Sequence, residues 1–296
     1  MNFFEILIYP GILFILFTSL FLSGIFRKIT ARMQSRIGPP IIQPFYDTIK
    51  LFGKENIRPA QAKNGFHIWP IISLTSIIIA ALMIPIAGIT ALNTGDLLIV
   101  LYFVALSSIT LYIAGFSTGN PFGHIGATRG IIQMVAYEFP LILSVLMPAV
   151  FLKTLSIDAI NLAQITGAWN ITLYPIAGII FLTAIIAALE LPPFHIPQAH
   201  QEIVGGYTVE YTGTNLAYIE ISHMIKMFVL ITLAINTFLG GAVTLSVFLA
   251  KTFGILIIFA FIRTLLARLR INHVLKFYWI LGYLLIIIYS VRLLLL

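Results

Sequence analysis

The sequence predicts an all-α fold, a polytopic membrane helix bundle with about eight transmembrane helices. Of the 296 residues, 60% are hydrophobic and only 9% are charged. An ordinary soluble domain is about a quarter charged, so a soluble fold of this composition could not cover its surface with polar groups. The apolar residues also gather in runs of roughly 20 residues, the length that a spanning helix needs.

The predicted spans follow one another along the whole chain. They cover approximately residues 3–26, 67–89, 96–116, 128–152, 171–190, 215–239, 242–263 and 274–295. The first run is followed, not preceded, by basic residues, which is the opposite order to a cleavable signal peptide, so it is expected to be a permanent span. We see no internal repeat and no separate soluble domain, and residues 1–296 are therefore expected to form a single integral membrane domain.

Two connections, at about 27–66 and 191–214, are too long to be simple turns. In the first, the apolar residues that recur near helical spacing are Ile42, Phe45, Ile49 and Phe52. This pattern predicts an amphipathic helix at the membrane interface, which could equally be a surface anchor or a docking surface. The second connection is rich in proline and then in glycine.

Basic residues gather in the connections rather than in the spans. They are Arg27, Lys28, Arg32, Arg36 and Lys50 in the first long connection, Arg129 at the end of the third-to-fourth connection, and Arg263, Arg268 and Arg270 in the last loop. With eight spans all three groups fall on one side, which the positive-inside rule assigns to the cytoplasm. Both termini are then expected outside the cell membrane. The net charge of +7 fits these loops better than a nucleic-acid partner.

Five carboxylates surround one predicted helix–loop–helix unit. Glu138 lies inside the fourth span, Glu190 ends the fifth, Glu220 lies within the sixth, and Glu202 and Glu210 lie in the loop between the last two. A carboxylate in hydrocarbon costs about 3 kcal/mol or more unless it is paired, hydrated or protonated. Such a row therefore predicts a route for protons, although any one member could be a structural partner, for example of Lys226.

Other ionisable groups lie close to this unit. Lys226 and Lys251 fall inside the sixth and seventh spans, Lys251 near the middle of its span, and His195 and His200 share the acidic loop. They could belong to the same relay, or the lysines could extend their charged ends to an interface. No metal-ligand spacing, Walker loop or Ser-His-Asp pattern stands out. The sequence contains no cysteine, which excludes disulfides and cysteine-ligated iron–sulfur clusters of its own.

Several stretches carry a family resemblance. Arg27–Pro39 is similar to RKxxAxxQxRxGP, Gln43–Leu51 with Asp47 to QPxxDxxKL, Arg129–Glu138 to RxxxQxxxYE, and Glu202–Gly213 to ELVxG…EYSG. In this order they resemble the membrane subunit that anchors the hydrophilic arm of respiratory complex I, known as subunit 1 or the H subunit, and of related energy-converting hydrogenases. Lys251 and the arginines of the last loop also match that family.

The departures from the family pattern narrow the resemblance. Quinone-reducing members carry the segment PFDLPEAExEL. In this sequence His195, Gln198 and His200 stand in place of three acidic residues of that segment. The stretch after Glu190 is also about two residues shorter than in those members. Ala199–Glu202 is similar to the THLE of hydrogenase-type members, and Glu210–Glu220 to their EYSGxxLAxIE. The nearer resemblance is thus to archaeal ferredoxin-linked membrane-bound hydrogenase or its sulfur-reducing relative, sulfane sulfur reductase.

The resemblance implies a membrane anchor and coupling subunit of an oxidoreductase and ion translocase, with no redox centre of its own. Ferredoxin would supply electrons to iron–sulfur clusters and, in the hydrogenase case, to a NiFe site in partner subunits. The implied partners are hydrogenase-like large and small subunits, an iron–sulfur protein, antiporter-like membrane subunits that move protons or sodium, and the lipid bilayer. The basic loops and Asp47 would dock the peripheral arm.

Two other functions remain open at this stage. One is a quinone-reducing complex I-like subunit. The other is a stand-alone secondary ion transporter, which would need internal repeats and broken helices near the middle of the membrane.

Overall fold

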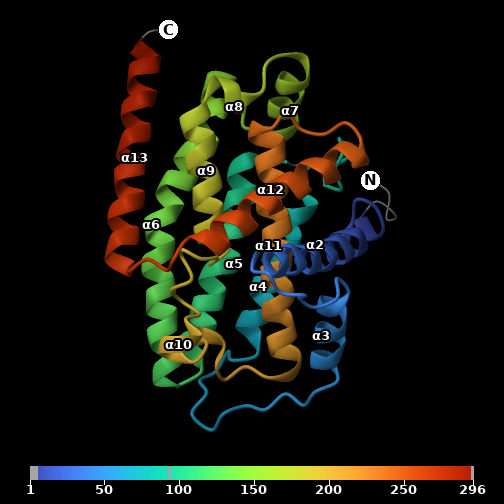
Figure 1. Cartoon of the computed structure of the whole chain (residues 1–296), viewed down its shortest axis with the longest axis vertical. Helices are drawn as coiled ribbons and strands as arrows, with labels where there is room; N and C mark the ends of the chain where they lie inside the picture. The colour runs from blue at the N-terminus through green and yellow to red at the C-terminus, as the bar shows by residue number, and fades with distance from the viewer. Residues whose placement is uncertain (1–5, 93–94, 295–296) are drawn as a thin grey trace.

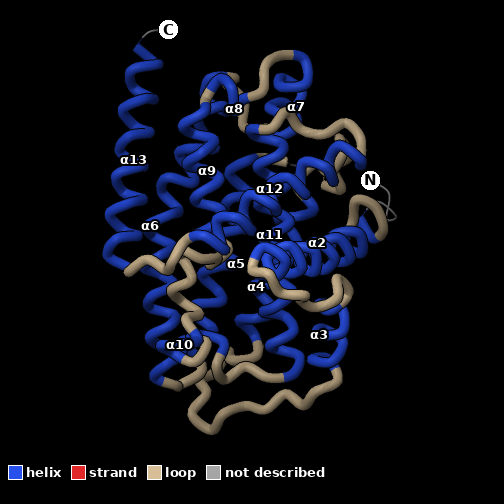
Figure 2. The backbone as a smooth tube through the Cα atoms, viewed as in Figure 1, coloured by secondary structure: helices blue, strands red, loops and turns tan. Residues whose placement is uncertain are grey.

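The structure is a computed structural model that describes residues 6–92 and 95–294 (Figures 1 and 2). In chain order its elements are α2 (Ile12–Met33), α3 (Gln43–Phe52), α4 (Ile68–Leu82), α5 (Leu97–Ser117), α6 (Pro121–Phe151), α7 (Ile157–Thr166), α8 (Asn170–Leu173), α9 (Pro175–Ala188), α10 (His200–Ile203), the 3₁₀ turn η1 (Gly206–Thr208), α11 (Gly213–Phe238), α12 (Leu245–Leu265) and α13 (Ile271–Leu294). Figure 2 shows no strand in the described part of the chain. The all-α prediction is confirmed.

The helices follow the order of the predicted spans. α2, α5, α6, α11, α12 and α13 are long and apolar enough to cross a membrane, and α4 and α9 are shorter apolar helices of 15 and 14 residues. A polytopic helical membrane bundle is therefore confirmed. Residues 3–5 of the first predicted span and residue 295 of the last lie outside the described residues.

Two predicted boundaries are wrong for local physical reasons. α2 continues to Met33, so no loop begins at Arg27, because Arg, Lys, Ala and Met are good helix formers and a charge that ends an apolar run need not end a helix. α6 begins at Pro121 rather than near residue 128, because the Asn120 side chain accepts a hydrogen bond from the Phe122 amide at 2.8 Å and caps the helix.

α6 is longer than a membrane crossing requires. Its 31 residues make a helix of about 46 Å at 1.5 Å per residue, against about 30 Å for the hydrocarbon core of a bilayer. At the other end of α6, the connection to α9 contains α7, which the sequence did not predict, and α8, which lies at the start of the predicted span 171–190. The Ser156 hydroxyl accepts a hydrogen bond from the Ala159 amide at 3.5 Å and so begins α7.

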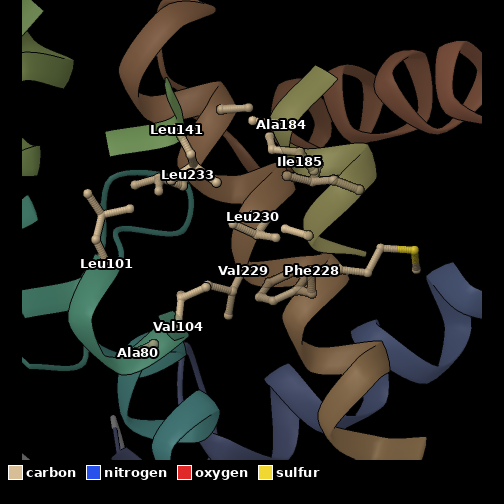
Figure 3. Close-up of a cluster of buried hydrophobic side chains, with 14 of the residues drawn as sticks. Ala80, Leu101, Val104, Leu141, Ala184, Ile185, Phe228, Val229, Leu230 and Leu233 are labelled. Atoms are coloured by element: carbon tan, nitrogen blue, oxygen red, sulfur yellow. The ribbon is translucent and has the colours of Figure 1, made fainter. Parts of the chain in front are cut away.

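The core surrounds α11. In the most apolar stretch of α11, 78% of the residues are buried, whereas in that of α13 only 22% are buried. Figure 3 shows side chains of α11 meeting those of its neighbours; the labelled residues are Phe228, Val229, Leu230 and Leu233 of α11, Ala80 of α4, Leu101 and Val104 of α5, Leu141 of α6, and Ala184 and Ile185 of α9. Close packing of this kind is the main source of helix association in lipid.

The C-terminal end of α11 is held by side-chain amides of α7 and α8, which lie together at the upper end of Figure 1. Gln164 Nε2 donates to the carbonyl of Asn236 at 2.7 Å, and Asn170 Nδ2 donates to the carbonyl of Thr237 at 2.8 Å. Gln164 Oε1 also accepts from the amide of Gly240 at 3.0 Å. These bonds satisfy the last carbonyls of α11, which have no partner within the helix.

α13 stands at one side of the bundle (red in Figure 1) and packs mainly on α6. Gly282 allows the close approach, because a Cβ there would meet the ring of Phe139 at 2.6 Å. The opposite face carries Ile280 and Ile287, which are 64% and 63% exposed. That face is therefore apolar and open to lipid or to a neighbouring protein.

The predicted amphipathic helix is α3. Its phenylalanines pack on the bundle, with the ring of Phe45 5.3 Å from Phe17 of α2 and the ring of Phe52 5.9 Å from Tyr218 of α11. Ile49 is 68% exposed. The helix is confirmed, while its role as an anchor or as a docking surface stays a prediction.

Candidate functional site

Two neighbouring cavities lie between the inner half of α11 and the turn that follows α9. The larger, of about 570 Å³, lies between α2, α3 and α11, and its charged lining residues include Arg27, Asp47, Lys50 and Glu220. The smaller, of about 200 Å³, is bounded by the turn from Leu189 to Gln198. The residues that line both are Leu189, Leu191, Glu220, His223 and Arg263. The two cavities thus form one chamber with an apolar and a charged part.

Glu190 forms the inner wall of the smaller cavity. It lies just past α9 with a φ of 52° and is 5% exposed. Its Oε1 accepts from the Tyr112 hydroxyl at 2.9 Å, and its Oε2 accepts from the Tyr207 hydroxyl at 3.0 Å. A left-handed backbone costs a non-glycine residue roughly 1–2 kcal/mol, so these bonds must hold the carboxylate in place.

A chain of polar side chains joins Glu190 to the chamber through Tyr207. The Tyr207 oxygen lies 3.0 Å from His223 Nε2, and it accepts from Gln198 Nε2 at 2.6 Å. Because Tyr207 donates its proton to Glu190, the histidine nitrogen in this arrangement is a donor. His223 and Gln198 both line the smaller cavity, so a proton taken from the chamber has a continuous path to the carboxylate.

Glycines place Tyr207 between α5 and α6. A Cβ on Gly126 would meet the Gly206 Cα at 2.6 Å and the Tyr207 amide nitrogen at 2.7 Å, and a Cβ on Gly115 would meet the Tyr207 Cβ at 2.5 Å. Only residues without a side chain allow the 3₁₀ turn to enter this gap. The fully buried Tyr207 ring is therefore fixed by the sequence of two other helices.

Lys226 of α11 is a buried cation near Glu190. It is 2% exposed, and its Nζ donates to the Ser108 hydroxyl at 2.7 Å. It is close enough to Glu190 and to the half-buried Glu138 to attract both carboxylates. Among the described residues Lys226 donates to Ser108 of α5 and forms no ion pair with Glu220, so the alternative that it serves as the partner of Glu220 is not supported.

The two acidic residues of the predicted acidic loop stand apart from this network. Glu202 accepts from Arg129 at 2.6 Å and also pairs with Arg268. The hydrogen bond from Arg129, with the charge of Arg268, holds the pKa of the Glu202 carboxyl below its usual range. Glu210 Oε1 accepts from Asn120 Nδ2 at 2.5 Å, beside the start of α6.

The two histidines of the loop differ in surroundings. His195 Nδ1 lies 2.8 Å from the Glu190 carbonyl, which can only accept, so this nitrogen carries the proton. Burial lowers the pKa of His195, which keeps its ring neutral. His200 is exposed, with its ring 6.3 Å from that of His195. Among the described residues, no group of three or more metal-binding side chains could hold an ion.

Lys251 lies at the opposite end of the bundle, in the second turn of α12 rather than near mid-span. Its Nζ donates to the carbonyls of Leu239 at 2.6 Å and Gly241 at 2.5 Å, just past the end of α11. It also lies 4.6 Å from the centre of the Trp169 ring. The structure therefore does not bring Lys251 together with the carboxylates of the inner half.

The basic residues predicted to dock a peripheral arm form two separate groups. Arg27 donates to Asp47 at 3.0 Å, and although desolvation acts in the other direction, hydrogen bonds from Gln43 and Arg27 hold the pKa of Asp47 below its ordinary value. This group, on α2, α3 and the segment after α2, contains Arg27, Lys28, Arg32, Arg36 and Lys50. Arg129, Arg268 and Arg270 form the second group around Glu202. Arg263 lies over the Phe26 ring in the chamber wall and lines a further cavity with Arg27 and Arg36, so it adjoins the first group.

Sequence reasoning missed the neutral members of the site. Tyr112, Tyr207, Gln198 and Ser108 were given no role, and His223 was noticed without one. A usable signal was present, because a polar side chain within an apolar span needs a partner. Which partner it has depends on tertiary contacts, which no spacing along the chain reveals.

Comparisons with known proteins agree on one family. The family model described as NADH dehydrogenase matches residues 6–294. The H subunit of the NADH-quinone oxidoreductase of Dehalococcoides mccartyi strain CBDB1 is 31% identical over 93% of this chain and 82% of its own length. The corresponding subunit of Rubrobacter xylanophilus is 34% identical over 86% of this chain and 83% of its own length.

A solved structure is similar over almost the whole fold. It is a chain of the membrane-bound sulfane sulfur reductase, an archaeal respiratory membrane complex. The two chains are 32% identical and superpose with a TM-score of 0.87, covering 94% of this chain and 96% of that one.

Proposed function

The chain belongs to the NADH dehydrogenase family, whose members include the H subunits of NADH-quinone oxidoreductases, and on this premise we propose that it is the membrane anchor and coupling subunit of a ferredoxin-linked respiratory complex. Its relatives are subunits of oxidoreductase complexes. The proposed complex reduces sulfur compounds or protons in its peripheral arm. This chain transmits the released free energy to subunits that move protons or sodium. Its own residues carry no electrons.

The likeness to the sulfane sulfur reductase chain supports the sulfur-reducing type. So do His195, Gln198 and His200, which replace acidic residues of the quinone-reducing pattern. In this proposal the iron–sulfur clusters lie in partner subunits, with a NiFe site only if the complex is a hydrogenase. The basic residues of α2 and α3, with Asp47, dock the arm. They face the cytoplasm, and both termini lie outside the cell membrane.

A quinone-reducing complex is the second candidate. Two observations favour it. The relatives of this chain include H subunits of NADH-quinone oxidoreductases, and the larger cavity of the chamber, about 570 Å³, falls in the range of small-molecule sites, about 300–1,000 Å³. A stand-alone transporter has no such support, since the relatives are subunits of larger complexes.

The double hydrogen bond of Glu190 to Tyr112 and Tyr207 is the observation that carries the coupling role. In the proposed step, His223 takes up a proton from the chamber on Nδ1 and passes its Nε2 proton to the Tyr207 oxygen, while Tyr207 passes its own proton to Glu190, so that the imidazole ends neutral. The tyrosine stays neutral throughout, and the carboxylate becomes a carboxylic acid.

Neutralising Glu190 removes a negative charge beside Lys226. The ammonium group then interacts more strongly with its other carboxylate neighbour, Glu138. Because the interior has a low effective dielectric constant, such a change in charge acts over several ångströms. Protonation of Glu190 thereby changes the electrostatic interaction between Lys226 and Glu138.

The test is Glu190→Gln in the intact complex, reconstituted in proteoliposomes. Glutamine keeps the size and one acceptor oxygen but cannot take up a proton. We expect ion uptake driven by reduced ferredoxin to fall at least tenfold, while the complex remains assembled. Asp158→Asn, which alters a carboxylate of α7 at the other end of the bundle, is the matched control. Wild-type ion uptake in Glu190→Gln would remove the basis for the relay.

A further inference from the structure

A third cavity, of about 470 Å³, opens where α13 begins. It is separate from the chamber and uses none of the same residues. Arg129 of α6 and the arginines of the α12–α13 connection, Arg268 and Arg270, line it together with Glu202. Three arginines and one carboxylate thus line the same cavity.

The charges of this cavity are only partly balanced within the chain. Both Glu202 oxygens are engaged, Oε2 by Arg129 at 2.6 Å and Oε1 by Arg268. Among the described residues Arg270 has no ion-pair partner. Glu202 therefore holds two guanidinium groups in fixed positions, while the lining keeps a net positive charge. Guanidinium groups placed in this way suit a phosphate, which they bind through paired hydrogen bonds.

The helix that starts at the cavity adds to this charge. α13 has 24 residues, and its first turn contains no acidic residue that would offset the positive end of the helix dipole. Ile271 and Asn272, the first two residues of α13, line the cavity. The amides of His273 and Val274 donate to the Arg270 carbonyl, so the amides of Ile271 and Asn272 are the ones that act on the same volume as the arginines.

The rest of the lining and its surroundings are apolar. Ile196 and Leu269 line the cavity between the charged groups. Just before it, Leu265 and Leu266 are 63% and 52% exposed, and on α13 Ile280 is 64% exposed. An occupant that carries an anionic head and hydrocarbon tails would meet both kinds of surface.

We propose that this cavity binds the phosphate of an anionic phospholipid from the leaflet at this end of the bundle. The headgroup lies on Arg270 and on the two arginines held by Glu202, and the acyl chains follow the exposed faces of α12 and α13. A lipid fits better than an acidic protein, because the charged pocket adjoins the start of an apolar span. The basic residues of α2 and α3 remain available for the peripheral arm.

The test titrates the purified, delipidated complex in mild detergent with phosphatidylglycerol, and separately with phosphatidylcholine of the same acyl chains, and counts bound lipid by native mass spectrometry. We expect selective binding of phosphatidylglycerol, weakened about fivefold in Arg270→Gln, the equivalent of about 1 kcal/mol for one basic group near a lipid surface. Arg270→Lys should retain the binding. Lys276→Gln, which removes an exposed charge one turn further along α13, should not change it.

Each other outcome would overturn the proposal in an identifiable way. Equal binding of the two lipids, or equal loss in Lys276→Gln, would mean that no specific site exists. Inorganic phosphate that binds as tightly as phosphatidylglycerol would identify a free anion as the ligand. Loss of peripheral subunits from Arg270→Gln, with lipid content unchanged, would show that the cavity docks a protein. A thermal unfolding scan confirms that each variant complex is intact.

Discussion

Tyr207 donates its hydroxyl proton to Glu190 across 3.0 Å, although the two residues belong to different segments on either side of the proline-rich turn. The same oxygen lies 3.0 Å from His223, which lines the chamber. This one hydroxyl group therefore connects the Glu190 carboxylate to His223 in the chamber wall.

Tyr207→Phe should uncouple the complex without unfolding it. The ring stays in the gap between α5 and α6, but Glu190 loses one donor and His223 loses its acceptor. An unsatisfied buried polar group costs about 1–3 kcal/mol, so we expect a modest fall in thermal stability and at least a tenfold loss of ion uptake in proteoliposomes.

Tyr211→Phe is the matched control for that change. Tyr211 is also buried and belongs to the same loop, but its hydroxyl donates to the carbonyls of Phe66 and Ala114 instead. It should lower stability by a similar amount and leave the ratio of ion uptake to turnover unchanged. Equal uncoupling by both variants would mean that the loop conformation, and not the Tyr207 hydroxyl, matters.

Gly126→Ala should displace Tyr207 by pushing on its backbone, without changing the tyrosine itself. The added methyl group would press on the backbone of Gly206 and Tyr207, and overpacking of this kind costs about 1–3 kcal/mol. We expect a lower thermal unfolding midpoint together with reduced ion uptake. Gly254→Ala in α12 meets nothing within 4 Å and should be neutral or slightly stabilising, since alanine favours a helix.

Acid should release the loop that contains α10. Because the pKa of Glu202 is lowered in the folded protein, its ion pairs contribute fully above the ordinary value of about 4.5 and are lost as the pH falls through the folded value. Limited proteolysis between pH 7 and pH 3 should show cleavage near Val204 rising in this acidic window. In Glu202→Gln, cleavage should be higher at pH 7 and should lose that pH dependence; a wild-type profile would show that the ion pairs do not hold the loop.

Lys251→Met tests whether Lys251 carries protons in the relay or only stabilises the fold through its hydrogen bonds to the carbonyls of Leu239 and Gly241. The ammonium group binds two carbonyls beyond the end of α11, so its removal should lower the thermal unfolding midpoint by a few degrees, the effect of about 1 kcal/mol in a membrane chain of this size. Coupling should persist in the variant complex that remains folded. Loss of ion uptake at unchanged stability would instead return Lys251 to the relay.

The apolar runs predicted the order of the helices because a bilayer imposes one length and one composition on every span. The ends were less accurate, since Arg27 continues a helix and Asn120 starts one early, and both depend on local capping and propensity rather than on hydropathy.

The candidate site was predictable in part. Glu138 and Glu190 stood out because carboxylates are rare in apolar segments. Their neighbours did not, because Tyr112 and Ser108 come from a different helix and meet these residues only after folding. Glu210 was grouped with them by its position in the chain, yet its bond to Asn120 places it beside the start of α6.

The amide groups of α7 and α8 fasten one end of α11 to its surroundings. A helix clamped at its far end cannot slide like a piston without breaking the bonds that Gln164 and Asn170 make to its last turn. Under the proposed coupling role, free energy released at the chamber must then be transmitted by another kind of motion. Side chains that exchange protons and reorient, inside a helical framework that stays still, would provide it.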